Sequence, residues 1–212
     1  MTRLYFARHG HSEANVAGVF ANRGDGFPLT AQGFGQARML AERLSGVPVD
    51  RIYTSPLLRA RQTADAVSAV TCAPVEVTGA LAECDMGELE GRSDAAGWAV
   101  HAEVNDDWVL KGRWDSRPPG GESLHDVQAR FTPLIDTLRA EDGDGSYILI
   151  GHGSLFRSVL PLVLANVDYS FTAQNGLDHT HLVVAEQIGA SFACRQWADR
   201  PVAPGEFLHH CE

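Results

Sequence analysis

The sequence predicts an α/β fold with three layers, α/β/α, in which helices cover both faces of a mostly parallel central sheet. Short apolar segments alternate along the chain with longer segments whose apolar residues recur at helical spacing. Residues 147–150 form an unbroken apolar run, which is typical of a central strand covered on both faces. A chain of 212 residues is long enough for one complete core, so we expect a single domain over residues 1–212.

Six segments have the short, apolar character of strands. The last two are separated by a short turn that contains Gly189, so we expect them to pair as a hairpin at one edge of the sheet. The predicted strands are residues 3–8, 51–54, 75–78, 147–150, 181–186 and 191–197.

Polar residues mark the predicted starts of the helices. Thr30 precedes a segment with apolar residues at helical spacing, and Ser55 precedes a proline, which is favoured at the first helical position. Ser123 and Asp126 have the spacing of a capping box, and an apolar helical pattern follows them. Ser154 is predicted to cap the last core helix.

Residues 85–121 do not fit this alternation. The segment is rich in glycine, tryptophan and charge, lacks a long helical period, and holds Trp98, Trp108 and Trp114. We expect a lid insertion made of helix and loops, too small to be a separate domain. Its tryptophans are expected to pack against the core or within the lid rather than to form a cage for a ligand.

The formal net charge of −10 argues against partners that are themselves strongly anionic. An acidic chain repels nucleic acid and anionic membrane surfaces, so we expect it to bind neither. A substrate that carries phosphate would need a local pocket of positive charge.

The rest of the composition is typical of a cytoplasmic protein. No apolar run is long enough to cross a bilayer, and Arg8 interrupts the apolar start of the chain too early for a signal peptide. The chain has no C-x-x-C pair and no other sign of secretion, so free thiols are predicted. The cysteines are Cys72, Cys84, Cys194 and Cys211.

Chemically active side chains follow three of the predicted strands. His9 follows the first strand, Arg59 comes shortly after the second, and His152 follows the central strand. The carboxyl ends of the strands are where open α/β sheets bind ligands, so these residues are expected to converge. Glu83 follows the third candidate strand and can reach the same edge.

This set of residues suits phosphoryl transfer. The reaction needs fixed donors around the phosphoryl oxygens, an in-line nucleophile, and an acid for the leaving oxygen. Arg8, Arg59 and His152 can supply the donors, because the arginine fork binds two oxygens at once. His9 can supply a nitrogen nucleophile that is neutral near pH 7, and Glu83 can supply the acid.

Several motifs occur in order along the chain, each after a predicted strand or at a predicted helix start. They are residues 4–15 (LYFARHGHSEAN), 29–33 (LTAQG), 53–64 (YTSPLLRARQTA), 81–83 (LAE), Gly87, 90–91 (EG), 120–123 (GGES) and 151–153 (GHG). This ordered set, which extends over nearly the whole chain, resembles the histidine phosphatase superfamily, the group that includes cofactor-dependent phosphoglycerate mutase.

The resemblance implies a role for each residue of the set. His9 is the nucleophile that becomes phosphorylated, and Arg8, Arg59 and His152 hold the phosphoryl oxygens. Glu83 protonates the leaving oxygen and then takes a proton from the attacking water. The group that binds phosphate or substrate also includes Ser12, Asn15 and Gly153.

The resemblance also bears on cofactors and partners. It implies no metal and no other cofactor, because arginines and histidines supply the positive charge. The expected activity is that of a histidine acid phosphatase-type phosphomonoesterase acting on a small phosphorylated metabolite. Family members are often dimers, so a homodimer is compatible with it. The sequence departs from the family pattern at two positions. His11 stands where family members usually have Glu or Gln, and Leu89 stands where an aromatic residue is common. These departures concern the identity of the substrate rather than the catalytic chemistry.

The residue patterns alone leave other interpretations open. An ordinary strand end can account for Arg8 and His9, a structural turn for His152, and a solvated helix surface for Arg59. The H-x-H spacings at 9–11 and 179–181 are compatible with a metal site, although nothing completes one at compelling spacing. The C-terminal residues 209–211, His-His-Cys, are expected to be a loose tail.

Three functions follow from the resemblance. A phosphatase is favoured over a phosphoglycerate mutase-type enzyme, because the basic residues of the insertion are outnumbered by acidic ones and a mutase must hold a bisphosphate. A non-catalytic protein that binds a phospho-ligand or another protein is the third, and the complete catalytic set argues against it. The basic residues are Arg92, Lys111, Arg113 and Arg117, and the acidic ones counted against them are Asp94, Glu103, Asp106, Asp107 and Asp115.

Overall fold

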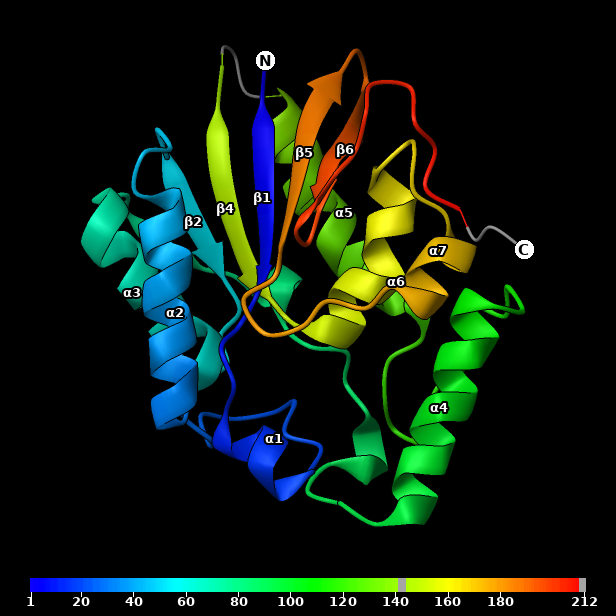
Figure 1. The fold of residues 1–212 in the computed structure, drawn as a ribbon. Coiled ribbons are helices and arrows are strands. Elements are labelled where there is room, and N and C mark those ends of the chain that lie inside the picture. Colours follow the sequence, from blue (N-terminus) through cyan, green and yellow to red (C-terminus); the bar gives the residue numbers. More distant parts are fainter. Residues whose placement is uncertain (141–143, 210–212) are drawn as a thin grey trace.

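The core of the protein is a mixed β-sheet with the strand order β3-β2-β4-β1-β5-β6-β7. The computed structural model describes residues 1–140 and 144–209, and within them β1 to β4 run parallel while β5, β6 and β7 are antiparallel to their neighbours (Figure 1). The strands are β1 (Arg3–Arg8), β2 (Arg51–Thr54), β3 (Val75–Val77), β4 (Ser146–Gly151), β5 (Leu182–Ile188), β6 (Ser191–Trp197) and β7 (Arg200–Pro201).

Helices cover both faces of the sheet, as predicted for a three-layer α/β/α fold (Figure 1). Alternate residues of β1 point to opposite faces: Tyr5 and Ala7 pack with α2 and α3, and Leu4 and Phe6 belong to the larger core with α5 and α6. The helices are α1 (Glu13–Ala17), α2 (Ala31–Leu44), α3 (Leu58–Thr71), α4 (Ala95–Val109), α5 (Leu124–Ala140), α6 (Gly153–Val163) and α7 (Tyr169–Gln174), with short 3₁₀ turns η1 (Gly79–Leu81) and η2 (Gly87–Leu89).

Two of the predicted helix starts are confirmed and two are wrong. Thr30 caps α2 by accepting from the Gly33 amide at 3.0 Å, and the Ser123–Asp126 capping box begins α5. Helix α3 begins at Leu58 with Leu57 at its N-cap rather than directly after Ser55, although the Ser55 hydroxyl accepts from the Leu57 amide at 3.2 Å and also lies 2.7 Å from His152 Nε2. Helix α6 begins at Gly153, so its N-cap is His152 and not Ser154.

The hairpin β5–β6 forms as predicted, and the short strand β7 extends the sheet beyond it. The insertion at 85–121 contains η2 and the 15-residue helix α4, whose length its sequence did not indicate. Helix α4 buries Asn105 and Asp107 beside its apolar residues, which obscures the helical period. Trp108 lies in the core and donates to the Ser116 carbonyl at 2.7 Å.

The described cysteines Cys72, Cys84 and Cys194 are free thiols, as predicted. Cys211 and His210, in the predicted loose tail, lie outside the described residues. Among the helices in the part of the chain that the structure describes, none is long and apolar enough to cross a membrane.

Candidate active site

The site begins where β1 and β4 end side by side. These strands pair in parallel with Arg8 opposite Gly151, and the His9 amide donates to the Gly151 carbonyl at 3.0 Å. The next residues along each strand are His9 and His152, so their rings come within 5.0 Å, centroid to centroid. The other neighbour of β4 is β2, and Arg59 extends from the first turn of the helix that follows β2.

Two glycines allow the turn after His9 to lie directly against α2. A Cβ at Gly10 would lie 2.6 Å from the Gly33 carbonyl oxygen, and a Cβ at Gly33 would lie 1.9 Å from the His11 carbonyl oxygen. A side chain at either position would therefore push the turn away from the helix. The Gly10 amide also donates to Thr63 Oγ1 at 3.1 Å, which ties the same turn to α3.

His9 is held as a neutral imidazole with one nitrogen available. Its Nδ1 lies 2.7 Å from the Gly10 carbonyl oxygen, so Nδ1 carries the proton and donates it there. Its Nε2 accepts a hydrogen bond from Arg59 Nε at 3.1 Å. Burial lowers the pKa of His9 well below its ordinary value, and the nearby charge of Arg59 lowers it further. The available lone pair is therefore on Nε2.

Arg59 is the centre of the buried cluster. Its Nη1 donates to the Ala21 carbonyl at 2.8 Å, and its Nη2 lies 3.4 Å from His152 Nδ1. His152 in turn lies 2.7 Å from the Ser55 hydroxyl through Nε2. Burial lowers the pKa of His152 well below its ordinary value, with Arg59 adding to the effect. Arg59 is thus fixed between the two histidines.

Arg8 adds a second guanidinium at the start of α6. Its Nη1 donates to the Leu177 carbonyl at 2.8 Å, whereas its Nε is buried without a hydrogen-bond partner among the described residues. A Cβ at Gly153 would lie only 3.3 Å from Arg8 Cζ, so the glycine allows the guanidinium to approach the helix closely.

Glu83 lies across from these cations, with its carboxylate at the N-terminus of α6. Its Oε1 accepts from the Leu155 amide at 2.8 Å and from the Cys84 amide at 2.9 Å, and its Oε2 accepts from the Ser154 amide at 3.2 Å. Burial lowers the pKa of both Arg8 and Arg59, and the Glu83 carboxylate acts in the opposite direction. The charge of Glu83 therefore acts on both arginines.

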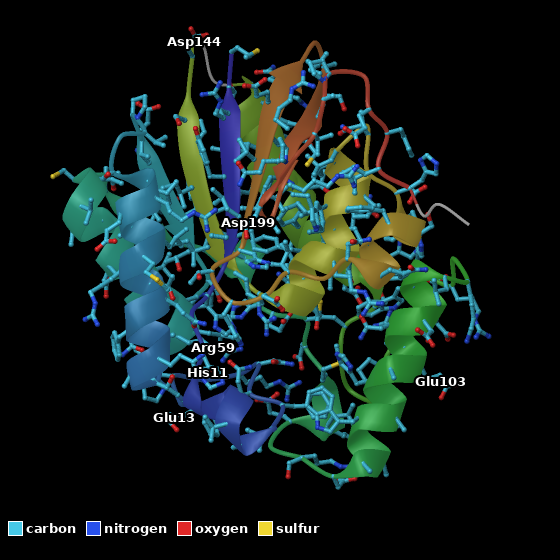
Figure 2. All side chains as sticks on the ribbon, viewed as in Figure 1. His11, Glu13, Arg59, Glu103, Asp144 and Asp199 are labelled. Carbon is cyan, nitrogen blue, oxygen red and sulfur yellow. The ribbon has the colours of Figure 1, made fainter. Side chains whose placement is uncertain are left out.

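A cavity of about 300 Å³ joins Arg8, His9, Arg59 and Glu83, whereas His152 is fully buried and is not among the described residues that line it. The cavity lies at the end of the sheet that faces α1, where Figure 2 shows Arg59 and His11. We call its two ends the phosphate end and the lid end. The phosphate end is lined by Arg8, His9, Asn15, Arg59, Glu83 and Gly153, and the lid end by Phe20, Met86, Trp98, His101 and Arg157.

Of the predicted binding residues Asn15 and Ser12, only Asn15 lines the cavity. Asn15 lines the cavity, and its Oδ1 accepts from the Ser12 amide at 3.0 Å and from the Ser12 hydroxyl at 2.8 Å. The Asn15 amide nitrogen is therefore the group that it can offer to a ligand. Ser12 is buried and is not among the described residues that line the cavity. It orients Asn15 instead.

Sequence reasoning missed the lid end and one residue beside the nucleophile. His179 Nδ1 lies 3.2 Å from the His9 carbonyl oxygen, and burial lowers the pKa of His179 to about 4. The H-x-H spacings were the signal for this cluster, because the His179 ring lies 5.5 Å from that of His9 and 5.2 Å from that of His11. In residues 1–140 and 144–209, no group of three or more His, Cys, Asp or Glu side chains is arranged to hold a metal ion.

Three known proteins illustrate what the chain is similar to. A probable phosphoglycerate mutase from Proteus mirabilis is 32% identical over 170 residues, covering 80% of this chain and 78% of that protein. An adenosylcobalamin/alpha-ribazole phosphatase from Salmonella typhimurium is 32% identical over 166 residues, covering 78% and 79%. The structure of a mycobacterial glucosyl-3-phosphoglycerate phosphatase superposes with a TM-score of 0.75 at 26% identity, covering 92% of this chain and 98% of that one.

The family assignment extends over most of the sequence. Residues 4–200 match the model of the histidine phosphatase superfamily (branch 1), a range that includes every residue of the cavity. The chain belongs to the histidine phosphatase superfamily.

Proposed function

We propose that the protein is a metal-independent phosphomonoesterase that hydrolyses a small phosphorylated metabolite through a phosphohistidine on His9, with Glu83 as the proton donor. The observation that carries this proposal is the state of His9. Its ring is neutral, its Nδ1 proton is committed to the Gly10 carbonyl, and its Nε2 lone pair lies among buried cations.

The first step transfers the phosphoryl group to the protein. The substrate's phosphate replaces the contact between Arg59 Nε and His9 Nε2, and it also takes the buried Nε of Arg8 as a donor. His9 Nε2 then attacks phosphorus, the bond from phosphorus to the leaving oxygen breaks, and Glu83 gives that oxygen a proton. The products are an alcohol and phosphohistidine, with Glu83 ionised.

The second step regenerates the protein. Water enters where the alcohol left, and Glu83 takes one of its protons as its oxygen attacks phosphorus. The bond from phosphorus to Nε2 breaks, its electron pair returns to His9, and inorganic phosphate leaves. Arg8 and Arg59 face the same phosphoryl group in both steps, with His152 in contact with Arg59 from outside the cavity lining, so they need no rearrangement between the steps.

Hydrolysis is favoured over mutase-type transfer by the charges of the insertion. A mutase must hold a second anionic group near the lid. Each basic side chain of residues 85–121 is already ion-paired, which leaves Arg157 of α6 as the arginine at the lid end, where it donates to the Ala173 carbonyl at 3.0 Å. Lys111 and Arg113 both pair with Asp107. The other pairs are Arg92 with Asp94 and Arg117 with Asp126. Phosphatases and probable mutases both occur among the relatives, so the distinction rests on this pairing.

The test is phosphate release from 4-nitrophenyl phosphate in the presence of EDTA. We expect the wild type to remain active and His9→Ala to lose at least about a thousandfold in rate. His125→Ala is the matched control, because the His125 side chain is 52% exposed and lies outside the cavity. Protein quenched in alkali during turnover should carry phosphate on His9. Equal rates for wild type and His9→Ala would refute the proposal.

The mutase alternative is tested with 3-phosphoglycerate and a bisphosphate primer. We expect release of inorganic phosphate without accumulation of the isomeric phosphoglycerate. Isomerisation faster than phosphate release would make the protein a mutase.

A further inference from the structure

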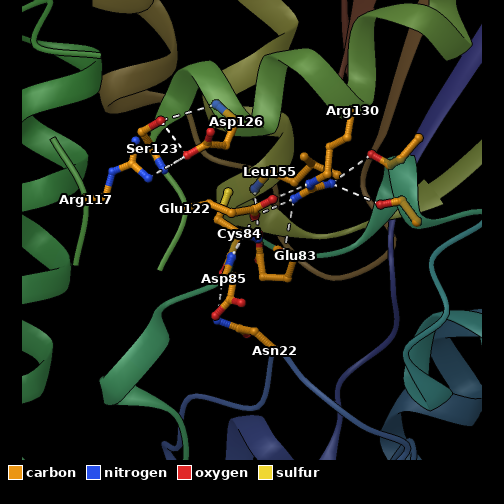
Figure 3. A network of polar contacts seen from close by, with 12 residues as sticks. Asn22, Glu83, Cys84, Asp85, Arg117, Glu122, Ser123, Asp126, Arg130 and Leu155 are labelled. Carbon is orange, nitrogen blue, oxygen red and sulfur yellow. Dashed lines mark hydrogen bonds and ion pairs between the residues drawn. The ribbon is translucent and has the colours of Figure 1, made fainter. Parts of the chain in front are cut away.

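A second polar cluster lies behind Glu83, outside the cavity (Figure 3). At its centre, Arg130 of α5 donates from Nε to Glu122 Oε1 at 2.8 Å and from Nη2 to Glu122 Oε2 at 3.1 Å. Both side chains are largely buried, with 21% and 24% of their surface exposed. A paired, two-point contact of this kind fixes the guanidinium plane.

The same guanidinium binds the backbone on one side of the proton donor. Arg130 Nη1 donates to the carbonyls of Gly79 and Ala80 at 3.2 and 3.0 Å, and Nη2 donates to the Glu83 carbonyl at 3.3 Å. These carbonyls belong to the turn η1 and the residues after it, which follow the end of β3. In this segment the Arg130 side chain binds backbone carbonyls that a neighbouring strand would bind in a sheet.

Glu122 binds the backbone on the other side. Its Oε2 accepts from the Asp85 amide at 3.0 Å, and its own amide donates to the Asp85 carbonyl at 2.9 Å. Residues 79–85 are therefore held on both sides of Glu83 by one ion pair. Neither Arg130 nor Glu122 is among the described residues that line the cavity.

We propose that Arg130 and Glu122 form a clamp that positions Glu83 for proton transfer. The Glu83 side chain is held by amides of α6, whereas its backbone is held by the clamp, so the carboxylate is fixed at both ends. Both clamp residues act through Glu83 and do not touch substrate. The inference rests on the proposed role of Glu83 as the proton donor.

The clamp should matter only when the leaving group needs a proton. An alkoxide is a poor leaving group and depends on the acid, whereas 4-nitrophenolate leaves readily without protonation. A misplaced Glu83 would therefore slow hydrolysis of an alkyl phosphate more than that of an aryl phosphate. General loss of structure would slow both to the same extent.

The experiment measures kcat/KM for glycerol 2-phosphate and 4-nitrophenyl phosphate, and the ratio of the two. This constant excludes hydrolysis of the shared phosphohistidine. For Arg130→Met we expect the glycerol 2-phosphate value to fall by at least about tenfold and the 4-nitrophenyl phosphate value by less than about threefold. Glu122→Gln should change the ratio in the same direction, and Arg130→Lys should restore it in part.

A matched control is available on the same helix. Arg139 donates to the Ala190 carbonyl at 3.0 Å and touches none of residues 79–85, so Arg139→Met should leave the ratio unchanged. If Arg130→Met does not fold, Glu122→Gln and Arg130→Lys carry the test. Equal losses for both substrates in these variants would overturn the clamp.

Glu83→Gln separates this inference from the proposed function. If Glu83 is the proton donor, Glu83→Gln alone lowers the ratio, and adding Arg130→Met to it lowers the ratio no further. If Glu83→Gln leaves the ratio unchanged, the assignment of the proton donor fails and the clamp fails with it. If Glu83→Gln lowers the ratio but the clamp variants do not, the clamp alone is wrong.

Discussion

The two ends of the cavity are built in different ways. The phosphate end comes from residues that follow neighbouring strands, and it is deeply buried: His9 is 3% exposed and Arg59 5%, and His152, which contacts Arg59 from outside the lining, is fully buried. The lid end comes from four separate segments, the loop after α1, the residue before η2, helix α4 and helix α6, and Trp98 is 41% exposed.

The contacts at the two ends differ in kind. At the phosphate end, Arg59 is connected by hydrogen bonds to His9 and to His152, and the His9 amide is bonded to β4. At the lid end, Trp98 packs on Phe20 with ring centroids 4.3 Å apart and donates to the Gly18 carbonyl at 3.1 Å. Because sheet register fixes one end and ring packing the other, the chemistry and the choice of leaving group should vary independently.

The largest expected effect is at the phosphate end. Arg59→Met removes the donor to His9 and, in the proposed mechanism, a donor to the phosphoryl oxygens, so kcat/KM should fall by about 10²–10³ for every substrate. The matched control is Arg61→Met, because Arg61 is on the same helix and pairs with Asp25 at the surface. Steady-state kinetics on aryl and alkyl phosphates measures both. A loss confined to one substrate would show that the two ends are not independent.

The phosphate end was largely predictable because its signals are local. Residues such as His9 and His152 directly follow strands, and parallel strands end at one edge, so strand assignment was sufficient to bring them together. At Ser55 the sequence signal for a helix start was correct only in part. The hydroxyl accepts from the Leu57 amide, but the helix begins three residues later, and the contact of the same hydroxyl with His152 could not be read from the sequence.

The lid end was not predictable for the opposite reason. Phe20 and Arg157 line the same cavity as Trp98 only through the folding of distant segments, and helix α4 buries polar residues that weaken its helical pattern. The clamp was also invisible, since nothing in the spacing of Arg130 and Glu122 shows that they bind the backbone around Glu83.

A smaller effect, on the free energy of unfolding, should follow from acidification, and it again concerns the histidines of the active site. Burial lowers the pKa of His9 and His152 well below 6.5, so below that pH the unfolded chain binds protons that the folded protein does not. The free energy of unfolding should therefore decrease as the pH falls. Between pH 7.5 and 5.5 each of these histidines contributes a loss of up to about 1.4 kcal/mol.

Urea unfolding at the two pH values measures this loss. His152→Gln should reduce the pH dependence of the free energy of unfolding by up to about 1.4 kcal/mol. A wild type whose stability is the same at both pH values would show that the histidines of the phosphate end become charged in the folded state.

The smallest expected effect is at the lid end. Trp98→Ala removes a ring that lines the cavity and packs on Phe20, so kcat/KM for 4-nitrophenyl phosphate should fall by up to about tenfold. The loss for glycerol 2-phosphate should be several times smaller, because a small alkyl group reaches less of the lid end. Trp98→Phe keeps an aromatic ring and should restore most of the difference. Equal losses for both substrates would mean that Trp98 supports the phosphate end, and that the lid does not choose the leaving group.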